Sequence, residues 1–219
     1  MPDTPAKIFL VDDDPHVREW LSNLIDQQDD LVVCGEAEDV PRAQRAIGSV
    51  KPDLAIVDIS LKGGSGMELI KAIKVQDPEV AVIVFSMHDE SVYAERAIRA
   101  GARGYVMKRE SAKNVVGAIR QVLGGRLYVS SDVAAIFAEK FLDSKVPGGG
   151  SPIEQLSDRE LEVFQLLGQG YDTRRVAETL HLSIKTVQAY CARIKEKLNL
   201  ASGTELLREA VYWHENRAG

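Results

Sequence analysis

Acidic residues stand at the ends of two apolar segments in this chain. Asp12, Asp13 and Asp14 follow the first segment, and Asp58 ends the segment 54–58. Burying an unpaired carboxylate is costly, so a carboxylate at the end of a buried strand requires an explanation. Carboxylates packed together repel one another, and a hard divalent cation with oxygen ligands, such as Mg²⁺, relieves that repulsion. The pattern therefore indicates a magnesium site containing an aspartate that can act as a nucleophile.

Two further polar residues end apolar segments. Ser86 follows residues 81–85, and Lys108 ends residues 104–108. A hydroxyl can donate to an oxyanion, and a lysine is a point charge suited to phosphate. Taken singly, each is ordinary: a serine after a strand is commonly a turn residue, a lysine is commonly solvated, and acidic residues are common where helices begin. Together, these groups could stabilise a phosphoryl group during its transfer.

The elements that must position these residues follow from the pattern of apolar segments. Those segments are short, rich in β-branched residues and without alternation, which is typical of buried parallel strands. Stretches with helical periodicity, such as 16–27 and 91–100, separate them. This alternation predicts an α/β fold with a doubly wound, five-stranded parallel sheet, in which the ends of strands one and three are neighbours. The expected strands are residues 7–11, 31–35, 54–58, 81–85 and 104–108.

The composition limits the class of protein. The 219 residues are 45% hydrophobic and 27% charged, which favours a soluble globular protein of one large or two ordinary domains. The net charge of −6 argues against a uniformly basic nucleic-acid coat, although a local basic face is compatible with it. No apolar run is long enough to cross a bilayer, and the N-terminus does not resemble a secretory signal. Cys34 and Cys191 form no metal-binding spacing, so a cytoplasmic location is expected.

A composition change divides the chain into two domains. The segment VPGGGSP at 146–152 predicts a flexible break. We expect one domain over residues 1–125, a linker over 126–152 with a helix near 130–143, and a second domain over 153–219.

The second domain is expected to be all-α, with four helices. Ser157 and Glu160 form a capping box for the first helix, and Asp172, Ser183 and Thr204 can cap the others. The short turn HLS at 181–183 joins the second and third helices. This arrangement is typical of a helix-turn-helix.

Residues 7 to about 123 resemble the receiver domain of bacterial two-component response regulators. The matching motifs are LVDDDP (10–15), DLAIVDISLKGGSGMEL (53–69), VIVFSMHDE (82–90) and GARGYVMK (101–108). In that family the strand-three aspartate accepts phosphate from the phosphohistidine of a histidine kinase, with Mg²⁺ required. The resemblance implies that the receiver can catalyse its own phosphorylation and dephosphorylation. It implies these roles: Asp58 as phosphoacceptor; Asp12, Asp13, Asp58 and the main-chain carbonyl of Ser60 as metal ligands; Ser86, Tyr105 and Lys108 as the phosphate switch.

Residues 156–211 resemble the DNA-binding domain of the LuxR and NarL/FixJ type, through LSDRELEV, VAETLHLSIKTV and KLN. The complete chain thus resembles a NarL/FixJ-family response regulator, a transcription factor and not a classical enzyme. The implied partners are a sensor histidine kinase, promoter DNA and, when active, a second copy of the chain. The expected DNA-binding residues are Lys185, Thr186, Gln188, Ala189, Tyr190, Ala192, Arg193 and Lys197.

Charge supports DNA binding only locally. Residues 151–219 carry nine basic and ten acidic residues, but the basic ones are concentrated on the third helix. Gln188 can read adenine bidentately, and an alanine can contact a thymine methyl group. The fourth helix is a candidate dimer face, although its apolar residues could equally be core of the domain; they are Leu206, Leu207, Val211 and Trp213.

Two other functions fit parts of the pattern. Aspartyl-nucleophile phosphatases also place an aspartate at a strand end, but they usually carry a second aspartate two residues later as general acid, where this chain has Ser60. The glycine-rich residues 63–66 lack the fingerprint of a nucleotide-binding loop. The other alternative is a receiver that switches a helical bundle which binds protein and not DNA.

Overall fold

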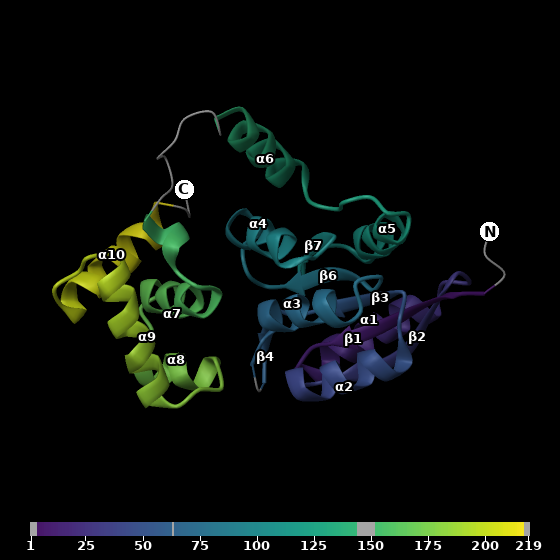
Figure 1. Cartoon of the computed structure of the whole chain (residues 1–219), viewed down its shortest axis with the longest axis horizontal. Coiled ribbons are helices and arrows are strands. Elements are labelled where there is room, and N and C mark those ends of the chain that lie inside the picture. The colour runs from purple at the N-terminus through teal and green to yellow at the C-terminus, as the bar shows by residue number, and fades with distance from the viewer. Residues whose placement is uncertain (1–3, 63, 144–151, 217–219) are drawn as a thin grey trace. The chain divides into compact units, whose positions relative to one another are not determined.

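The computed structural model describes residues 4–62, 64–143 and 152–216, and of residues 141–143 it describes the backbone alone. The chain divides into two compact units, Met1–Lys145 and Val146–Gly219 (Figure 1). The predicted break at 146–152 lies outside the described residues except for Pro152. Within the described part of the chain, no helix is both long and apolar enough to cross a membrane.

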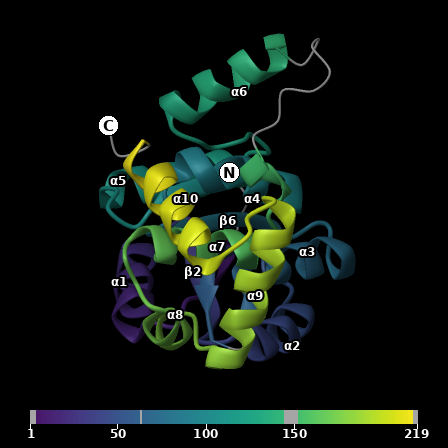
Figure 2. The ribbon, with the colours of Figure 1, turned by 90° about the vertical axis from the view of Figure 1, so that its left-hand side faces the viewer.

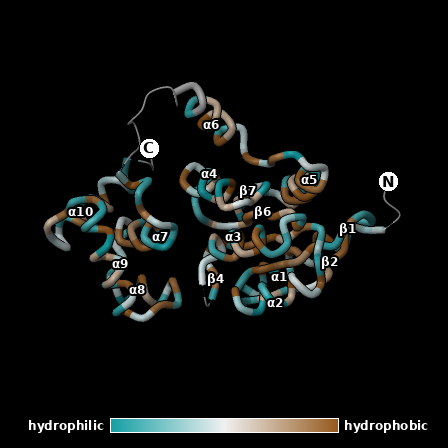
Figure 3. Tube along the Cα trace, in the orientation of Figure 1, coloured by the Kyte–Doolittle hydropathy of each residue, from teal (hydrophilic) through white to brown (hydrophobic). Residues whose placement is uncertain are grey.

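The first unit is built on a five-stranded parallel sheet with the strand order β2-β1-β3-β6-β7. The central strands are buried on both faces, as their continuous apolar sequences predict. Figure 3 shows that hydrophobic residues are concentrated along these strands. The predicted doubly wound α/β fold is confirmed. The strands are β1 (Ala6–Val11), β2 (Leu31–Ala37), β3 (Leu54–Val57), β6 (Ala81–Ser86) and β7 (Gly104–Met107).

Helices cover both faces of this sheet (Figure 1). Helices α1 and α5 contact each other on one face, and α2, α3 and α4 contact in turn on the other. Each helix is preceded by a capping residue whose side chain accepts a hydrogen bond from a backbone N–H of the first turn. In chain order, the capping residues are Asp14, Asp39, Ser65, Asp89 and Ser111. The helices are α1 (Pro15–Asp26), α2 (Val40–Val50), α3 (Gly66–Gln76), α4 (Glu90–Ala100) and α5 (Ala112–Leu123).

A small hairpin follows β3 and shapes the chain around Asp58. It consists of β4 (Ser60–Leu61) and β5 (Gly64–Ser65), and the Gly66 N–H then donates to the Ile59 carbonyl at 2.8 Å. A Cβ atom on Gly66 would lie 1.9 Å from the Asp58 carbonyl oxygen. Only glycine permits this approach, so Gly66 allows the hairpin to lie against the strand end.

The predicted linker is described as far as Asp143, and this part of it belongs structurally to the first unit. Tyr128 exchanges backbone hydrogen bonds with β7: its carbonyl accepts from the Tyr105 N–H, and its N–H donates to the Arg103 carbonyl. Helix α6 (Ser131–Asp143) follows and packs on α4, where Lys140 pairs with Glu95. Burial alone would raise the pKa of Glu95, but the bonds and charges of Lys140 and Arg99 lower it.

In the described part of the second unit, four α-helices form a bundle, preceded by a 3-10 turn, η1 (Pro152–Gln155). Figure 2 turns this bundle toward the viewer. The predicted capping box of Ser157 and Glu160 is present, and Asp172 and Ser183 cap the next two helices as predicted. The prediction for Thr204 was wrong: Ser202 accepts from the Glu205 N–H at 3.1 Å, so the helix begins at Gly203. The helices are α7 (Asp158–Gly168), α8 (Thr173–Thr179), α9 (Ile184–Lys197) and α10 (Gly203–Glu215).

Candidate functional site

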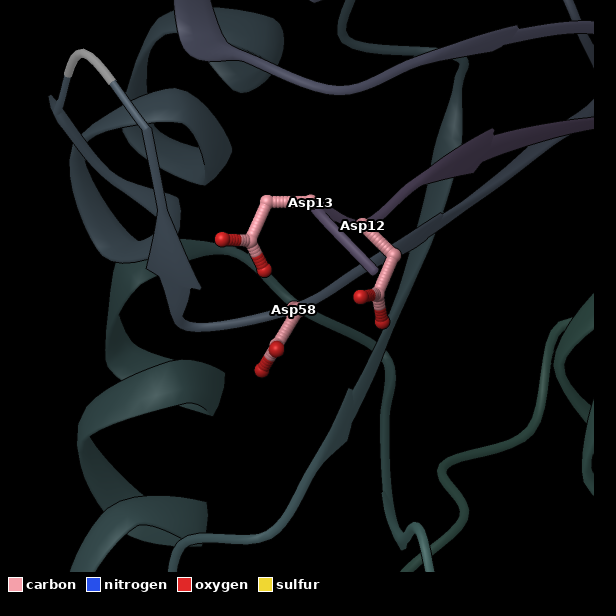
Figure 4. A group of neighbouring side chains, drawn as sticks. All are labelled: Asp12, Asp13 and Asp58. Carbon is pink, nitrogen blue, oxygen red and sulfur yellow. The ribbon is translucent and has the colours of Figure 1, made fainter. Parts of the chain in front are cut away.

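The three predicted acidic residues converge at one edge of the sheet. Asp12 and Asp13 follow β1, and Asp58 follows β3, which pairs with β1 in parallel. One carboxylate oxygen from each lies within 4.8 Å of the others (Figure 4). Parallel strands bring their carboxyl ends to the same edge, which is why residues 45 positions apart form one cluster. Oxygen ligands of this kind fit a hard divalent cation.

Burial and repulsion make the cluster electrostatically unfavourable on its own. Burial, with a second contribution from the charge of Asp58, raises the pKa of the Asp12 carboxyl to about 6. A cation bound between the carboxylates would lower this repulsion, so the donors fit the metal that the sequence predicts. The Arg18 guanidinium donates to the main-chain carbonyl of Asp12 at 2.7 Å and helps to fix the end of β1.

Lys108 lies at the end of β7 and reaches both buried carboxylates. Its Nζ is 2.7 Å from Asp12 Oδ2 and 2.7 Å from Asp58 Oδ2. Burial alone would lower the pKa of Lys108, but the charges of Asp58 and Asp12 more than offset burial and raise it. The lysine is therefore a fixed cation beside Asp58.

The Asp58 carboxylate accepts hydrogen bonds on both oxygens. Ser86 Oγ and the Ile59 backbone N–H each donate to Oδ1 at 2.6 Å, while Lys108 donates to Oδ2 at 2.7 Å. Donors from β6, β7 and the chain after β3 thus fix its orientation. These donors can bind the oxygens of a tetrahedral anion as well as those of a carboxylate.

Tyr105 lies beneath the loop between β6 and α4. Its ring is buried, and its hydroxyl donates to the His88 carbonyl at 2.8 Å. Burial, followed by the charge of Asp58, raises the pKa of Tyr105 well above its usual value. The hydroxyl therefore stays protonated and joins β7 to the loop that follows Ser86.

His88 is a site residue that the sequence analysis missed. Its Nε2 lies 2.9 Å from Ser60 Oγ, and its ring lies 4.7 Å from the ring of Tyr93 between centroids. It therefore joins the loop after β6 to the hairpin after β3. The available signal for His88 was its position two residues after the end of β6. Its partner, Ser60, could not be predicted because it lies 28 residues away in the sequence.

Helix α9 presents most of the predicted DNA-binding residues to solvent. Together with α8 and the turn at 180–183 it forms a helix-turn-helix, with His181 in the left-handed region at φ 52°. Gln188 and Ala192 also line a cavity of about 500 Å³ that extends to the N-terminus of α10. The exposed members of the predicted set are Lys185, Gln188, Ala189, Ala192, Arg193 and Lys197, while Thr186 and Tyr190 are half-buried.

Basic residues of this set have partners inside the domain. Lys197 Nζ pairs with Glu160 Oε2 at 2.7 Å and donates to the Gln155 carbonyl at 3.1 Å, so it joins α9 to the start of α7. Burial alone would raise the pKa of Glu160, but Lys197 and Ser157 lower it. The Arg193 guanidinium lies 5.7 Å from the centroid of the Tyr190 ring. A phosphate contact by Lys197 would compete with its ion pair.

The apolar residues of α10 divide between core and surface. Leu206 is buried, and the half-buried Trp213 packs edge-on against Phe164 at 5.8 Å between ring centroids. Leu207 and Tyr212 are exposed. The four predicted dimer-face residues therefore do not form one free surface: Leu206 belongs to the core of the domain.

Two family models match the two units. The model of the response regulator receiver domain matches residues 8–120. The model of the bacterial regulatory proteins of the luxR family matches residues 154–210.

Complete proteins of similar length also match. Oxygen regulatory protein NreC of Staphylococcus carnosus (strain TM300) is 32% identical over 209 residues, which cover 94% of this chain and 96% of NreC.

Solved structures match one or both units. A LuxR-family two-component response regulator from Aurantimonas sp. SI85-9A1 is 37% identical, with a TM-score of 0.59, and covers 64% of this chain and 99% of its own. RcsB of Salmonella enterica serovar Typhimurium, bound to promoter P1flhDC in the presence of the phosphomimetic BeF3⁻, is 25% identical. That match has a TM-score of 0.63 and covers 94% of this chain and 98% of RcsB.

The order of the two domains, the strand-end carboxylates and the helix-turn-helix agree with these matches. The chain belongs to the two-component response regulators of the NarL/FixJ type, with an N-terminal receiver domain and a C-terminal LuxR-type DNA-binding domain.

Proposed function

We propose that Asp58 accepts a phosphoryl group from the phosphohistidine of a sensor histidine kinase, and that phosphorylation promotes binding of a homodimer to promoter DNA. The observation that carries the proposal is the environment of Asp58. Its carboxylate is oriented by Ser86, the Ile59 N–H and Lys108, beside two further carboxylates. Promoter DNA of bacteria lies in the cytoplasm, so we place the protein there.

The Asp58 carboxylate acts as the nucleophile in this proposal. Asp12, Asp13, Asp58 and the main-chain carbonyl of Ser60 would hold Mg²⁺, which when bound neutralises charge on the phosphoryl oxygens. Lys108 and the Ser86 hydroxyl would bind phosphoryl oxygens in place of the carboxylate oxygens that they now contact. Since these groups act on the phosphoryl group itself, a small phosphodonor such as acetyl phosphate should replace the kinase.

A gel shift at two salt concentrations tests the function as a whole. The full-length protein, with Mg²⁺ and with or without acetyl phosphate, is titrated against a pool of genomic fragments. We expect retarded fragments that are enriched in particular sequences, with affinity that falls as salt rises. A protein that gained phosphate but retarded no fragment at low salt would instead support the protein-binding alternative.

Magnesium affinity should depend on pH because a proton competes for Asp12. The pKa of Asp12 is raised to about 6, so this ligand is charged above pH 6 and increasingly protonated below it. Metal binding requires the deprotonated carboxylate. Mg²⁺ affinity measured by calorimetry should therefore change little between pH 7.5 and 7, and fall by about tenfold per unit well below pH 6.

The same titration separates a metal site from a merely acidic loop. Asp13→Ala should weaken Mg²⁺ binding at pH 7.5 and slow phosphorylation, and Asp12→Ala should do so to a similar or smaller extent. Asp12→Ala should also flatten the pH dependence, because the titrating ligand is gone. Mg²⁺ affinity independent of pH from 5 to 7.5 in the parent protein would contradict the assignment of Asp12.

Gln188 and the exposed basic residues of α9 should have different effects on DNA binding. The Gln188 amide offers a donor and an acceptor to one base, so Gln188→Ala should cost about 1–3 kcal/mol on a preferred duplex and little on a scrambled one. Lys185→Ala should weaken both duplexes alike and reduce the salt dependence by about one ion. The measurement is a titration of both variants on both duplexes at two salt concentrations. Equal losses for Gln188→Ala on the two duplexes would exclude base reading by this residue.

A further inference from the structure

The first turn of α9 carries a large apolar side chain in contact with solvent. Ile184 is the first residue of the helix and is 45% exposed. Among the described residues of the helix-turn-helix, Ile184 is the only large aliphatic residue that is exposed. Removing apolar surface from water is favourable, and the N-terminal residues of a recognition helix contact base edges in the major groove. Ile184 therefore lies where DNA could cover it.

The polar groups of this turn are engaged in capping the helix. Ser183 Oγ accepts from the Thr186 N–H at 3.0 Å, and it lies 2.7 Å from Thr186 Oγ1. Both hydroxyls are thus held against the helix end. Ser183 is exposed, but its hydroxyl is engaged in the cap; the exposed side chains of the turn that have no part in the cap are those of Ile184 and Lys185, one apolar and one basic.

Ile184 shares a stripe of the helix with Gln188. Residues four apart lie on the same face, and both side chains are exposed. Their Cα atoms are separated by about 6 Å along the axis, against about 3.4 Å between neighbouring base pairs. They would thus meet positions one or two base pairs apart. The exposed neighbours Ala189 and Ala192 are short, which allows the helix to approach the groove closely.

We infer that Ile184 is a specificity-determining residue that packs against the 5-methyl group of a thymine, one or two base pairs from the base read by Gln188. The major groove offers one apolar group, the thymine methyl, and an aliphatic side chain is its chemical complement. The inference rests on the proposed function, since it requires α9 to enter the groove. It adds an apolar reader to a helix whose other exposed side chains are polar, charged or very small.

Thymine-to-deoxyuridine substitution isolates this contact, because deoxyuridine lacks only the methyl group. A preferred duplex is first selected from a random library with the full-length protein, Mg²⁺ and acetyl phosphate. Each thymine of that duplex is then replaced singly, and the affinities of parent and Ile184→Ala are measured. One position should weaken the parent about three- to fivefold, as expected for one methyl group, and leave Ile184→Ala unaffected. Ile184→Val should lose an intermediate amount.

Val75→Ala provides a matched control, because Val75 is also a solvent-exposed aliphatic residue but lies on α3 of the first unit. This variant should keep the parental deoxyuridine profile. Thermal unfolding of all variants separates a loss of folding from a loss of contact, and the midpoint of Ile184→Ala should stay near that of Val75→Ala.

The outcomes distinguish the inference from the function on which it rests. Identical deoxyuridine profiles in parent and Ile184→Ala would overturn the role of Ile184 and leave the proposed function standing. A similar loss for Ile184→Ala on every duplex, together with a lowered unfolding midpoint, would make Ile184 a structural residue and also overturn the inference. A parent that selects no sequence preference at low salt would overturn both.

Discussion

Asp58→Asn should abolish phosphorylation of the protein. Incubated with Mg²⁺ and acetyl phosphate, the parent should gain one phosphoryl group that hydroxylamine releases, and the variant should gain none. An amide is not a nucleophile toward phosphorus, although it keeps the size of the side chain and an oxygen acceptor for Ser86, Ile59 and Lys108. Intact-mass measurement before and after hydroxylamine gives the result directly.

Asp14→Asn is the matched control for this experiment. Asp14 belongs to the same acidic run, but its carboxylate caps α1 by accepting from the His16 N–H at 2.9 Å. Asparagine caps a helix about as well as aspartate, so this variant should be labelled like the parent. Full labelling of Asp58→Asn, or loss of labelling in Asp14→Asn alone, would show that the acceptor is not Asp58.

Much of the fold could be predicted because its signals are local. Continuous apolar segments identified the five parallel strands, and capping side chains such as Ser157 and Ser183 identified where helices begin. The convergence of Asp12 and Asp58 followed from the topology, since parallel strands share their carboxyl edge. Ser202 and Thr204 are both capping residues in one turn, and sequence alone does not decide between them.

The features that could not be predicted depend on contacts between residues distant in sequence. The bond between Ser60 and His88 spans 28 residues, and the pairing of Lys197 with Glu160 spans 37. No periodicity marks either pair. The segment after residue 125 was predicted to be a linker because it lies between two glycines and the glycine-rich break at 146–152, yet Tyr128 pairs with β7 and α6 packs on α4. Tertiary pairing decided these cases and local propensity did not.

Lys108→Ala should separate phosphorylation from its consequence. The variant should still be labelled on Asp58, because the nucleophile and the acidic cluster remain. It should lose most of the gain in DNA affinity that phosphorylation gives the parent, because β7 would no longer carry a cation that binds the phosphoryl group. Lys108 directly follows β7, the strand that carries Tyr105, and Tyr105 is bonded to the loop after Ser86, so movement of Lys108 can reach that loop. Ser86→Ala should have the same effect more mildly.

Removing Lys108 also leaves Asp12 and Asp58 without the cation that both now contact. Loss of one partner from a buried ion pair typically costs about 3–5 kcal/mol, so stability must be measured beside function, with Mg²⁺ present. Lys108→Arg keeps the charge with a different geometry and should restore stability while restoring the response only in part. Arg109→Ala, which removes an exposed neighbouring cation, is the control and should respond like the parent.

The decisive quantity is the ratio of DNA affinities with and without acetyl phosphate, measured on protein whose labelling has been quantified. For the parent and Arg109→Ala this ratio should be large, and for Lys108→Ala it should approach one at equal labelling. A folded, labelled Lys108→Ala with the parental ratio would exclude the lysine from the switch. Such a result would not affect the assignment of Asp58 as the phosphoacceptor. In this proposal Asp58 is the nucleophile, whereas Lys108 only binds oxygens of the phosphoryl group.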